Sequence, residues 1–231
     1  MLKQIVSEMQ SLSSPQKAKI LSGFFKTGKG HYGEGDVFLG IVVPLQRKVA
    51  AKYKALSLPE VRQLLCSKIH EHRLTALFIL IHRFKKADER GKEDIVKLYL
   101  ANTKNINNWD LVDLSAPNIL GEYLLNKDRK LLYKLASSSL LWDKRIAMLA
   151  TLSFIRKNDF KDALNIAELL LKDTHDLIHK AVGWMLREIG KRDLKAEEDF
   201  LKRHCRQMPR TMLRYAIEKL DDKKKKFYMK K

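Results

Sequence analysis

Apolar residues recur at helical spacing along almost the whole chain, and short polar connections separate the runs. The first clear case begins with a hydroxyl cap and a proline at Ser14-Pro15, after which Ile20, Leu21 and Phe24 follow at helical spacing. No convincing strand alternation interrupts the pattern, so the sequence predicts an all-α fold. Further helices are expected over residues 44–53, 57–65, 73–84, 92–100, 110–114, 117–125, 129–136, 143–155, 159–171, 176–189, 196–204 and 209–220.

The expected helices are short, numerous and joined by connections of a few residues. Their lengths and spacing indicate helix pairs that repeat about every forty residues, the period of HEAT-like arrays. The sequence therefore predicts an α-solenoid of HEAT-like helix pairs, a single domain over residues 1–222 with a concave basic face. Because the repeats show no strict self-similarity, an ordinary α-helical globule with irregular packing is the alternative.

The charge balance of the chain points to a polyanionic partner. Among 231 residues, 46 Lys and Arg stand against 27 Asp and Glu, a formal net charge of +19. No apolar run approaches eighteen residues, and the N-terminal residues lack the apolar stretch of a signal peptide, so no membrane association is expected. The two cysteines, Cys66 and Cys205, are far apart, which excludes a disulfide framework and fits the reducing cytoplasm.

Two segments depart from the helical pattern. Residues 26–40 hold five of the ten glycines and predict a flexible loop, but no Gly-Lys-Ser/Thr ending or preceding strand supports a nucleotide-binding loop. Lys26, Lys29, His31 and Tyr32 in this loop are suited to contact phosphates. Residues 223–231 form a basic C-terminal tail, interpreted either as a solvated, frayed end or as a non-specific phosphate contact.

Residues that can carry chemistry gather in three predicted helices. In the first, an Asn cap and Asp110 satisfy free backbone amides, and Asp113 lies four residues after Trp109, on the same helix face. In the second, Arg145 begins a nearly apolar stretch and has no obvious partner nearby in sequence. In the third, Trp184 precedes an Arg-Glu pair at residues 187 and 188.

The spacing of these residues approaches one helix-pair repeat. Arg145 follows Trp109 by 36 residues, and Trp184 follows Arg145 by 39. Equivalent points of successive repeats line one surface of a solenoid, so Trp109, Asp113, Arg145 and Trp184 are expected on one concave wall. Indole faces and a carboxylate stabilise a cationic, sugar-sized species, while arginine binds phosphate. The alternative is three core tryptophans with solvated charges.

No metal or cofactor is expected. His175 and His179 have the i,i+4 spacing of metal ligands, but no third ligand is evident, and His70-Glu71-His72 differs from a zincin motif in order and spacing. No Ser–His–Asp set emerges from the sequence.

An ordered set of short motifs makes the chain resemble the AlkD-type DNA alkylation-repair glycosylases, which are built from HEAT-like repeats. The resemblance covers nearly the whole length of the chain. The glycine-rich loop over residues 26–40 is longer here than in the best-known members of the family. The motifs are Tyr32-Gly33-Glu34-Gly35-Asp36, Phe38-Leu39-Gly40-Ile41, Pro44 through Arg47, Asn108-Trp109-Asp110-Leu111-Val112-Asp113, Lys144-Arg145-Ile146-Ala147, Gly183-Trp184-Met185-Leu186-Arg187-Glu188 and Met208-Pro209-Arg210-Thr211.

The resemblance implies hydrolytic excision of cationic alkylated purines, such as 3-methyladenine and 7-methylguanine, from double-stranded DNA, by a monofunctional enzyme without a base-specific pocket. It assigns the oxocarbenium-stabilising carboxylate to Asp113, the flanking indoles to Trp109 and Trp184, and a phosphate contact to Arg145. A cytoplasmic monomer, nucleoid-associated when bound to DNA, is expected. The DNA-binding residues expected are Arg145, Arg187, Lys144, Tyr32, Arg47, Arg210 and Arg214.

Two other functions stay open at this stage. Some relatives keep the fold without catalysis, so a HEAT-repeat protein that only binds damaged or branched DNA is the alternative. A scaffold for a protein partner is the third hypothesis, and the net charge of +19 argues against it.

Overall fold

The computed structural model describes residues 1–230, and these residues fall into two compact units that divide after Ser115. The regular secondary structure of the described chain is helical apart from one isolated parallel bridge between Val37 and Ile69, which confirms the all-α prediction. No helix within residues 1–230 combines the length and the apolar character needed to cross a bilayer.

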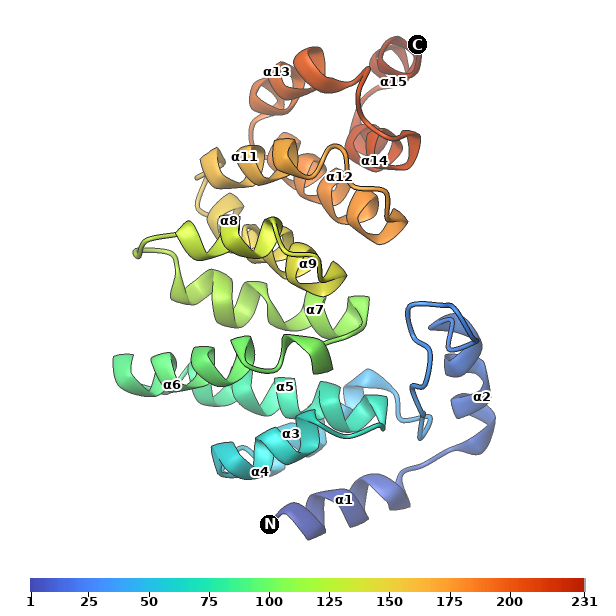
Figure 1. Ribbon diagram of the computed structural model, residues 1–231, viewed down its shortest axis with the longest axis vertical. Helices are drawn as coiled ribbons and strands as arrows, with labels where there is room; N and C mark the ends of the chain where they lie inside the picture. Colours follow the sequence, from blue (N-terminus) through green and yellow to red (C-terminus); the bar gives the residue numbers. More distant parts are fainter. Residues whose placement is uncertain (231) are drawn as a thin grey trace. The chain divides into compact units, whose positions relative to one another are not determined.

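The first unit, Met1–Ser115, is built around helix α5 (Figure 1). The buried residues of α5 include all but two of its fifteen, and α3, α4, α6 and α7 pack against it. The helices of this unit are α1 (Leu2–Ser11), α2 (Pro15–Phe24), α3 (Val43–Lys52), α4 (Leu58–Leu65), α5 (His70–Phe84), α6 (Glu89–Leu100), η1 (Thr103–Asn105) and α7 (Trp109–Ser115).

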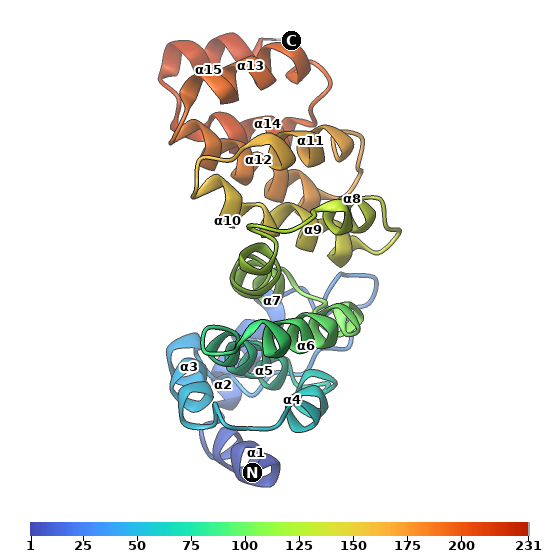
Figure 2. The same cartoon turned by 90° about the vertical axis from the view of Figure 1, so that its left-hand side faces the viewer.

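The second unit, from Ala116 to the C-terminus, is built around helix α12. Helices α9, α11, α13 and α14 pack against α12, as Figure 2 shows for the upper part of the chain. The helices of this unit are η2 (Pro117–Gly121), α8 (Lys130–Ala136), α9 (Leu141–Ala150), α10 (Leu152–Ile155), α11 (Lys161–Leu169), α12 (Asp176–Gly190), α13 (Leu194–His204), α14 (Arg210–Ala216), η3 (Ile217–Lys219) and α15 (Asp222–Met229).

Local signals in the sequence set several helix starts. The Ser14 hydroxyl accepts a hydrogen bond from the Lys17 backbone N–H, and Pro15 occupies the first helical position as predicted. At α4, Ser57 and Glu60 form a reciprocal capping box. The single helix expected over 143–155 is instead two helices, α9 and α10, with Thr151 between them.

Residues 223–229 of the predicted basic tail belong to helix α15. The Asp221 carboxylate caps this helix by accepting the Lys224 N–H, and the Lys224 ammonium pairs with Glu198 at 2.8 Å. Tyr228 is buried, which ties the helix to the unit. This segment is therefore a packed helix and not a frayed end.

Candidate functional site

Helix α7 presents the indole and the carboxylate that the sequence singles out. The Asn108 side-chain oxygen accepts the Trp109 N–H at 2.8 Å, and the Asp110 carboxylate accepts the Leu111 N–H at 2.9 Å. These bonds satisfy amides of the first turn, as the sequence predicts. Trp109 and Asp113 both lie on α7, half-buried and four residues apart, so their side chains leave the same helix face.

A stack of aromatic rings holds the Trp109 indole. Phe25 stacks on Trp109 with ring centroids 5.3 Å apart. Phe38 in turn stacks on Phe25, with ring centroids 5.2 Å apart. Phe24 meets the indole edge-on at 5.9 Å. Phe24 and Phe25 lie at the end of α2 and Phe38 lies within the glycine-rich loop, so the loop and the indole are held by one set of contacts.

His70 links this stack to two buried carboxylates. Its Nε2 lies 2.8 Å from an Asp110 carboxylate oxygen, its Nδ1 lies 3.2 Å from an Asp36 oxygen, and its ring stacks on Phe38 at 4.6 Å. Burial disfavours the charged imidazole, but the hydrogen bonds to Asp110 and Asp36 outweigh burial and raise the pKa of His70. Through its contacts with both carboxylates, His70 therefore joins α5, α7 and the loop.

Two further residues at the start of α5 bind the loop. Arg73 donates to Asp36 at 2.7 Å; burial opposes ionisation of Asp36, yet the contacts of His70 and Arg73 lower its pKa. The fully buried Glu71 carboxylate accepts the backbone N–H groups of residues 39, 40 and 41 at 2.8–3.2 Å. Gly40 has φ +82°, and a Cβ there would lie 2.2 Å from the Ser14 carbonyl oxygen, so glycine is required.

Sequence reasoning missed this network of Asp36, His70, Arg73 and Asp110. The available signal was His70-Glu71-His72, charged residues opening a helix that is otherwise apolar, which were weighed only as metal ligands. Within residues 1–230, no group of three or more His, Cys, Asp or Glu side chains is arranged to hold a metal ion.

In the second unit, helix α9 carries Lys144 and Arg145. Arg145 is 4% exposed, and its guanidinium donates to the Leu177 carbonyl oxygen in the first turn of α12. Lys144 pairs with Asp173 at 2.7 Å, just before α12. Both cations therefore bind residues at or just before the start of α12. These partners lie 29 and 32 residues further along the chain, and the sequence did not reveal them.

Helix α12 carries Trp184 and Arg187. The half-buried Trp184 indole donates its N–H to Glu188 at 2.9 Å, and Arg187 pairs with Glu218. Gly183 lets α12 approach α14 closely, because a Cβ there would lie 2.4 Å from the Met212 carbonyl oxygen. His175 accepts the Leu177 N–H at the start of α12, and His179 contacts the Asp173 carbonyl oxygen, so both histidines have structural partners.

The other predicted DNA-binding residues are spread over both units. Tyr32 is half-buried in the glycine-rich loop, and the exposed Arg47 lies over the Phe78 ring at 4.2 Å. Arg210 is exposed and donates to the Met229 carbonyl oxygen, while Arg214 is exposed on α14. In the first unit, Trp109 and Asp113 lie on one helix. In the second unit, Arg145 contacts α12, the helix that carries Trp184. Their convergence on one concave wall stays a prediction.

The fold and these motifs define an all-α helical-repeat protein. The sequence model of the DNA alkylation repair enzyme family matches residues 5–220, and the chain belongs to this family. No curated protein sequence matches the chain significantly.

Solved structures share the fold. A protein of Enterococcus faecalis, described as a predicted DNA alkylation repair enzyme, is 17% identical with a TM-score of 0.70, over 91% of this chain and 97% of that one. AlkD2 of Streptococcus mutans is 17% identical with a TM-score of 0.55, over 96% and 100% of the two chains. The smu.31 protein of Streptococcus mutans is 16% identical with a TM-score of 0.55, over 95% and 99%.

Proposed function

We propose that this protein is a monofunctional DNA glycosylase, which hydrolyses the N-glycosidic bond of cationic alkylated purines such as 3-methyladenine and 7-methylguanine in duplex DNA. Family membership supports a role in the repair of alkylated DNA. The observation that carries the finer proposal is helix α7. Its Asp113 carboxylate lies one turn from the Trp109 indole, which contacts the rings of Phe24 and Phe25, and its Asp110 is bound by the buried His70.

The chemistry requires little besides stabilisation of positive charge. As the bond between the sugar C1′ and the base nitrogen breaks, its electron pair leaves with the base, and the cationic purine departs neutral. Positive charge then develops on the sugar, where the Asp113 carboxylate stabilises it, as carboxylates do in glycoside hydrolysis. Water adds to C1′ and loses a proton to Asp113 or to solvent. No acid is needed at the leaving group.

The indoles and the cations have supporting roles in the proposal. Trp109 and Trp184 face the sugar and backbone of the lesion, where aromatic faces favour a cation. Arg145 binds the phosphate beside the lesion, and Lys144, Arg187, Tyr32, Arg47, Arg210 and Arg214 contact other phosphates and steepen the salt dependence of binding. A fixed Trp109 contributes to catalysis because its ring does not have to be reoriented during the reaction.

The test is release of free purines from methylated duplex DNA. The wild-type protein should liberate 7-methylguanine and 3-methyladenine without cleaving the strand, and Asp113→Asn should lower the rate on the order of 100-fold or more, the scale of losing a preorganised charge stabiliser. Glu122→Gln, an exposed carboxylate outside α7, is the control and should keep full activity.

DNA binding is measured in parallel on the same variants by fluorescence anisotropy at fixed salt. We expect Asp113→Asn to bind methylated duplex as well as the wild type. Wild-type protein that binds damaged or branched DNA but frees no base would establish the non-catalytic alternative. Equal release by Asp113→Asn and wild type would remove Asp113 from the mechanism.

A further inference from the structure

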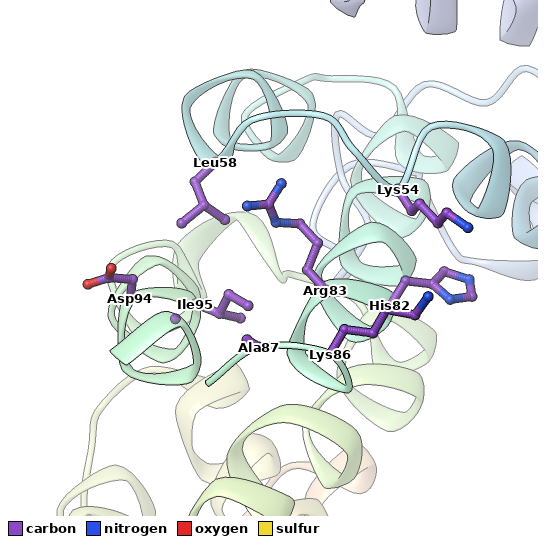
Figure 3. Close-up of a pocket in the computed structure, with 9 residues that line it drawn as sticks. Lys54, Leu58, His82, Arg83, Lys86, Ala87, Asp94 and Ile95 are labelled. Carbon is purple, nitrogen blue, oxygen red and sulfur yellow. The ribbon is translucent and has the colours of Figure 1, made fainter. Parts of the chain in front are cut away.

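A hollow of about 380 Å³ opens at the C-terminal end of α5, between α4 and α6 (Figure 3). Its polar lining is mainly cationic, with Lys54, His82 and Lys86 on one side of Arg83 in the figure. On the other side of Arg83 lie the apolar side chains of Leu58 and Ile95 and the carboxylate of Asp94. The volume is within the range of small-molecule sites.

The hollow has an excess of positive charge, because its lining holds Lys54, Arg83 and Lys86 against the carboxylate of Asp94. Within the described part of the chain, neither Lys54 nor Lys86 forms an ion pair, and Arg83 donates to the Leu56 carbonyl oxygen at 2.6 Å, not to an acid. Burial, followed by the positive charges of Lys85, Lys54, Arg47 and Lys86, lowers the pKa of His82. The protein thus maintains a concentrated positive potential that an anion would neutralise.

This hollow is separate from the candidate catalytic residues of the same unit. His70, which contacts Asp110 beside Trp109, is the first residue of α5, and His82 lies twelve residues further along the same helix. At 1.5 Å per residue the two positions are about 18 Å apart along the axis. A ligand in the hollow therefore does not occupy the site beside α7.

We propose that the hollow is a binding site for a small phosphomonoester of nucleotide size. Lys54, His82 and Lys86 surround the phosphate, whose two negative charges at neutral pH match a cluster of cations and cation precursors. The Leu58 and Ile95 side chains form an apolar wall for a planar base. Asp94 accepts hydrogen bonds from hydroxyl groups, and its charge would repel the continuing phosphates of a nucleic acid strand, which favours a free nucleotide over DNA.

The test is calorimetric titration of the full-length protein with adenosine 5′-monophosphate. We expect saturable one-to-one binding that is at least tenfold tighter than the binding of either inorganic phosphate or adenosine alone. Lys54→Gln combined with Lys86→Gln should weaken binding at least tenfold. Lys48→Gln combined with Lys68→Gln removes the same two charges from exposed residues of this unit that do not line the hollow, and this control should change affinity by less than threefold.

Protonation provides a second readout. Because the pKa of His82 is lowered, the imidazole is mainly neutral at pH 7, and a bound phosphate should make it take up a proton. The other charged groups around His82 are Lys54, Lys85, Lys86, Arg47, Arg83 and Asp94. The binding enthalpy of the wild type should vary with the ionisation enthalpy of the buffer, and that of His82→Gln should not.

Three results would overturn the proposal. The first is the absence of saturable binding of adenosine 5′-monophosphate to a protein whose circular dichroism shows it folded. The second is binding that the Lys48/Lys68 control and the Lys54/Lys86 variant weaken equally, which would indicate general charge attraction. The third is tight binding of a short undamaged duplex through Lys54 and Lys86 without binding of the nucleotide. None of these results depends on glycosylase activity.

Discussion

Replacing His70 with glutamine should loosen the loop and the indole together. In the wild type, the imidazole lies between Asp36 and Asp110 with its side chain 2% exposed. Glutamine is uncharged, and its amide group cannot reach both the Asp36 and the Asp110 carboxylates as the two imidazole nitrogens do. The variant therefore leaves two buried carboxylates with one cation fewer between them.

The expected cost follows from the remaining contacts. Removing one partner of a buried ion pair costs about 3–5 kcal/mol. Arg73 stays 2.7 Å from Asp36, so only Asp110 loses its cation entirely, and we expect the lower end, about 3 kcal/mol. In a chain of this size that corresponds to a fall in Tm of roughly 6–12 °C. His82→Gln on the same helix is the control, because its ring is half-buried without a carboxylate partner, and its expected change is within about 0.5 kcal/mol.

Two measurements check the His70 variant. Urea unfolding gives the free energy of unfolding, and limited trypsin digestion reports the loop, where Lys29 should be cut faster in His70→Gln than in the wild type. The difference in stability should also depend on pH. Since the folded pKa of His70 is above its ordinary value of 6.5, its stabilisation is complete below pH 6.5 and declines as pH rises through the folded pKa.

The difference between wild type and His70→Gln should therefore be largest near pH 6 and shrink toward pH 10. A difference that stays constant over this range would mean that folding does not raise the pKa of His70. Unchanged stability with unchanged digestion at Lys29 would refute the assignment of His70 as the link between loop and α7.

Two further predictions concern the second unit. Burial, and then Glu198, raises the pKa of Glu197 to about 8, so at pH 7 the folded protein keeps protonated a carboxyl group that ionises in the unfolded chain. Glu197→Gln should therefore raise the free energy of unfolding by about 3 kcal/mol at pH 7 in urea titrations, with no gain at pH 4. An equal gain at both pH values would contradict this reasoning. Gly183→Ala should lower stability by about 1–3 kcal/mol, because its Cβ would meet the Met212 carbonyl oxygen and Tyr215 within 2.5 Å. Gly23→Ala in α2, where no atom lies within 4 Å of the added Cβ, is its calorimetric control and should be neutral or stabilising; similar losses in both would refute the packing argument.

Much of the fold could be predicted because its signals are local. Helical periodicity, the Ser14-Pro15 start and the Ser57 capping box each depend on residues within one or two turns of each other. The i,i+4 placement of Trp109 and Asp113 is equally local, since one helix decides it. The family motifs likewise lie in short stretches whose order the chain itself fixes.

What surrounds those residues was decided by tertiary structure. His70 meets Asp36 and Asp110 across 34 and 40 residues, and Arg145 reaches Leu177 across 32. No periodicity records which distant carboxylate a buried cation will approach, because that choice depends on how helices pack and which groups packing removes from water. The sequence alone determined most of the helices and the positive charge, and it supplied the residues that we propose act on DNA. Only packing decided that His70 lies between two acids that raise its pKa, and that burial raises the pKa of Glu197 to about 8. It also decided that Lys54 and Lys86 face a hollow in which, among residues 1–230, neither forms an ion pair.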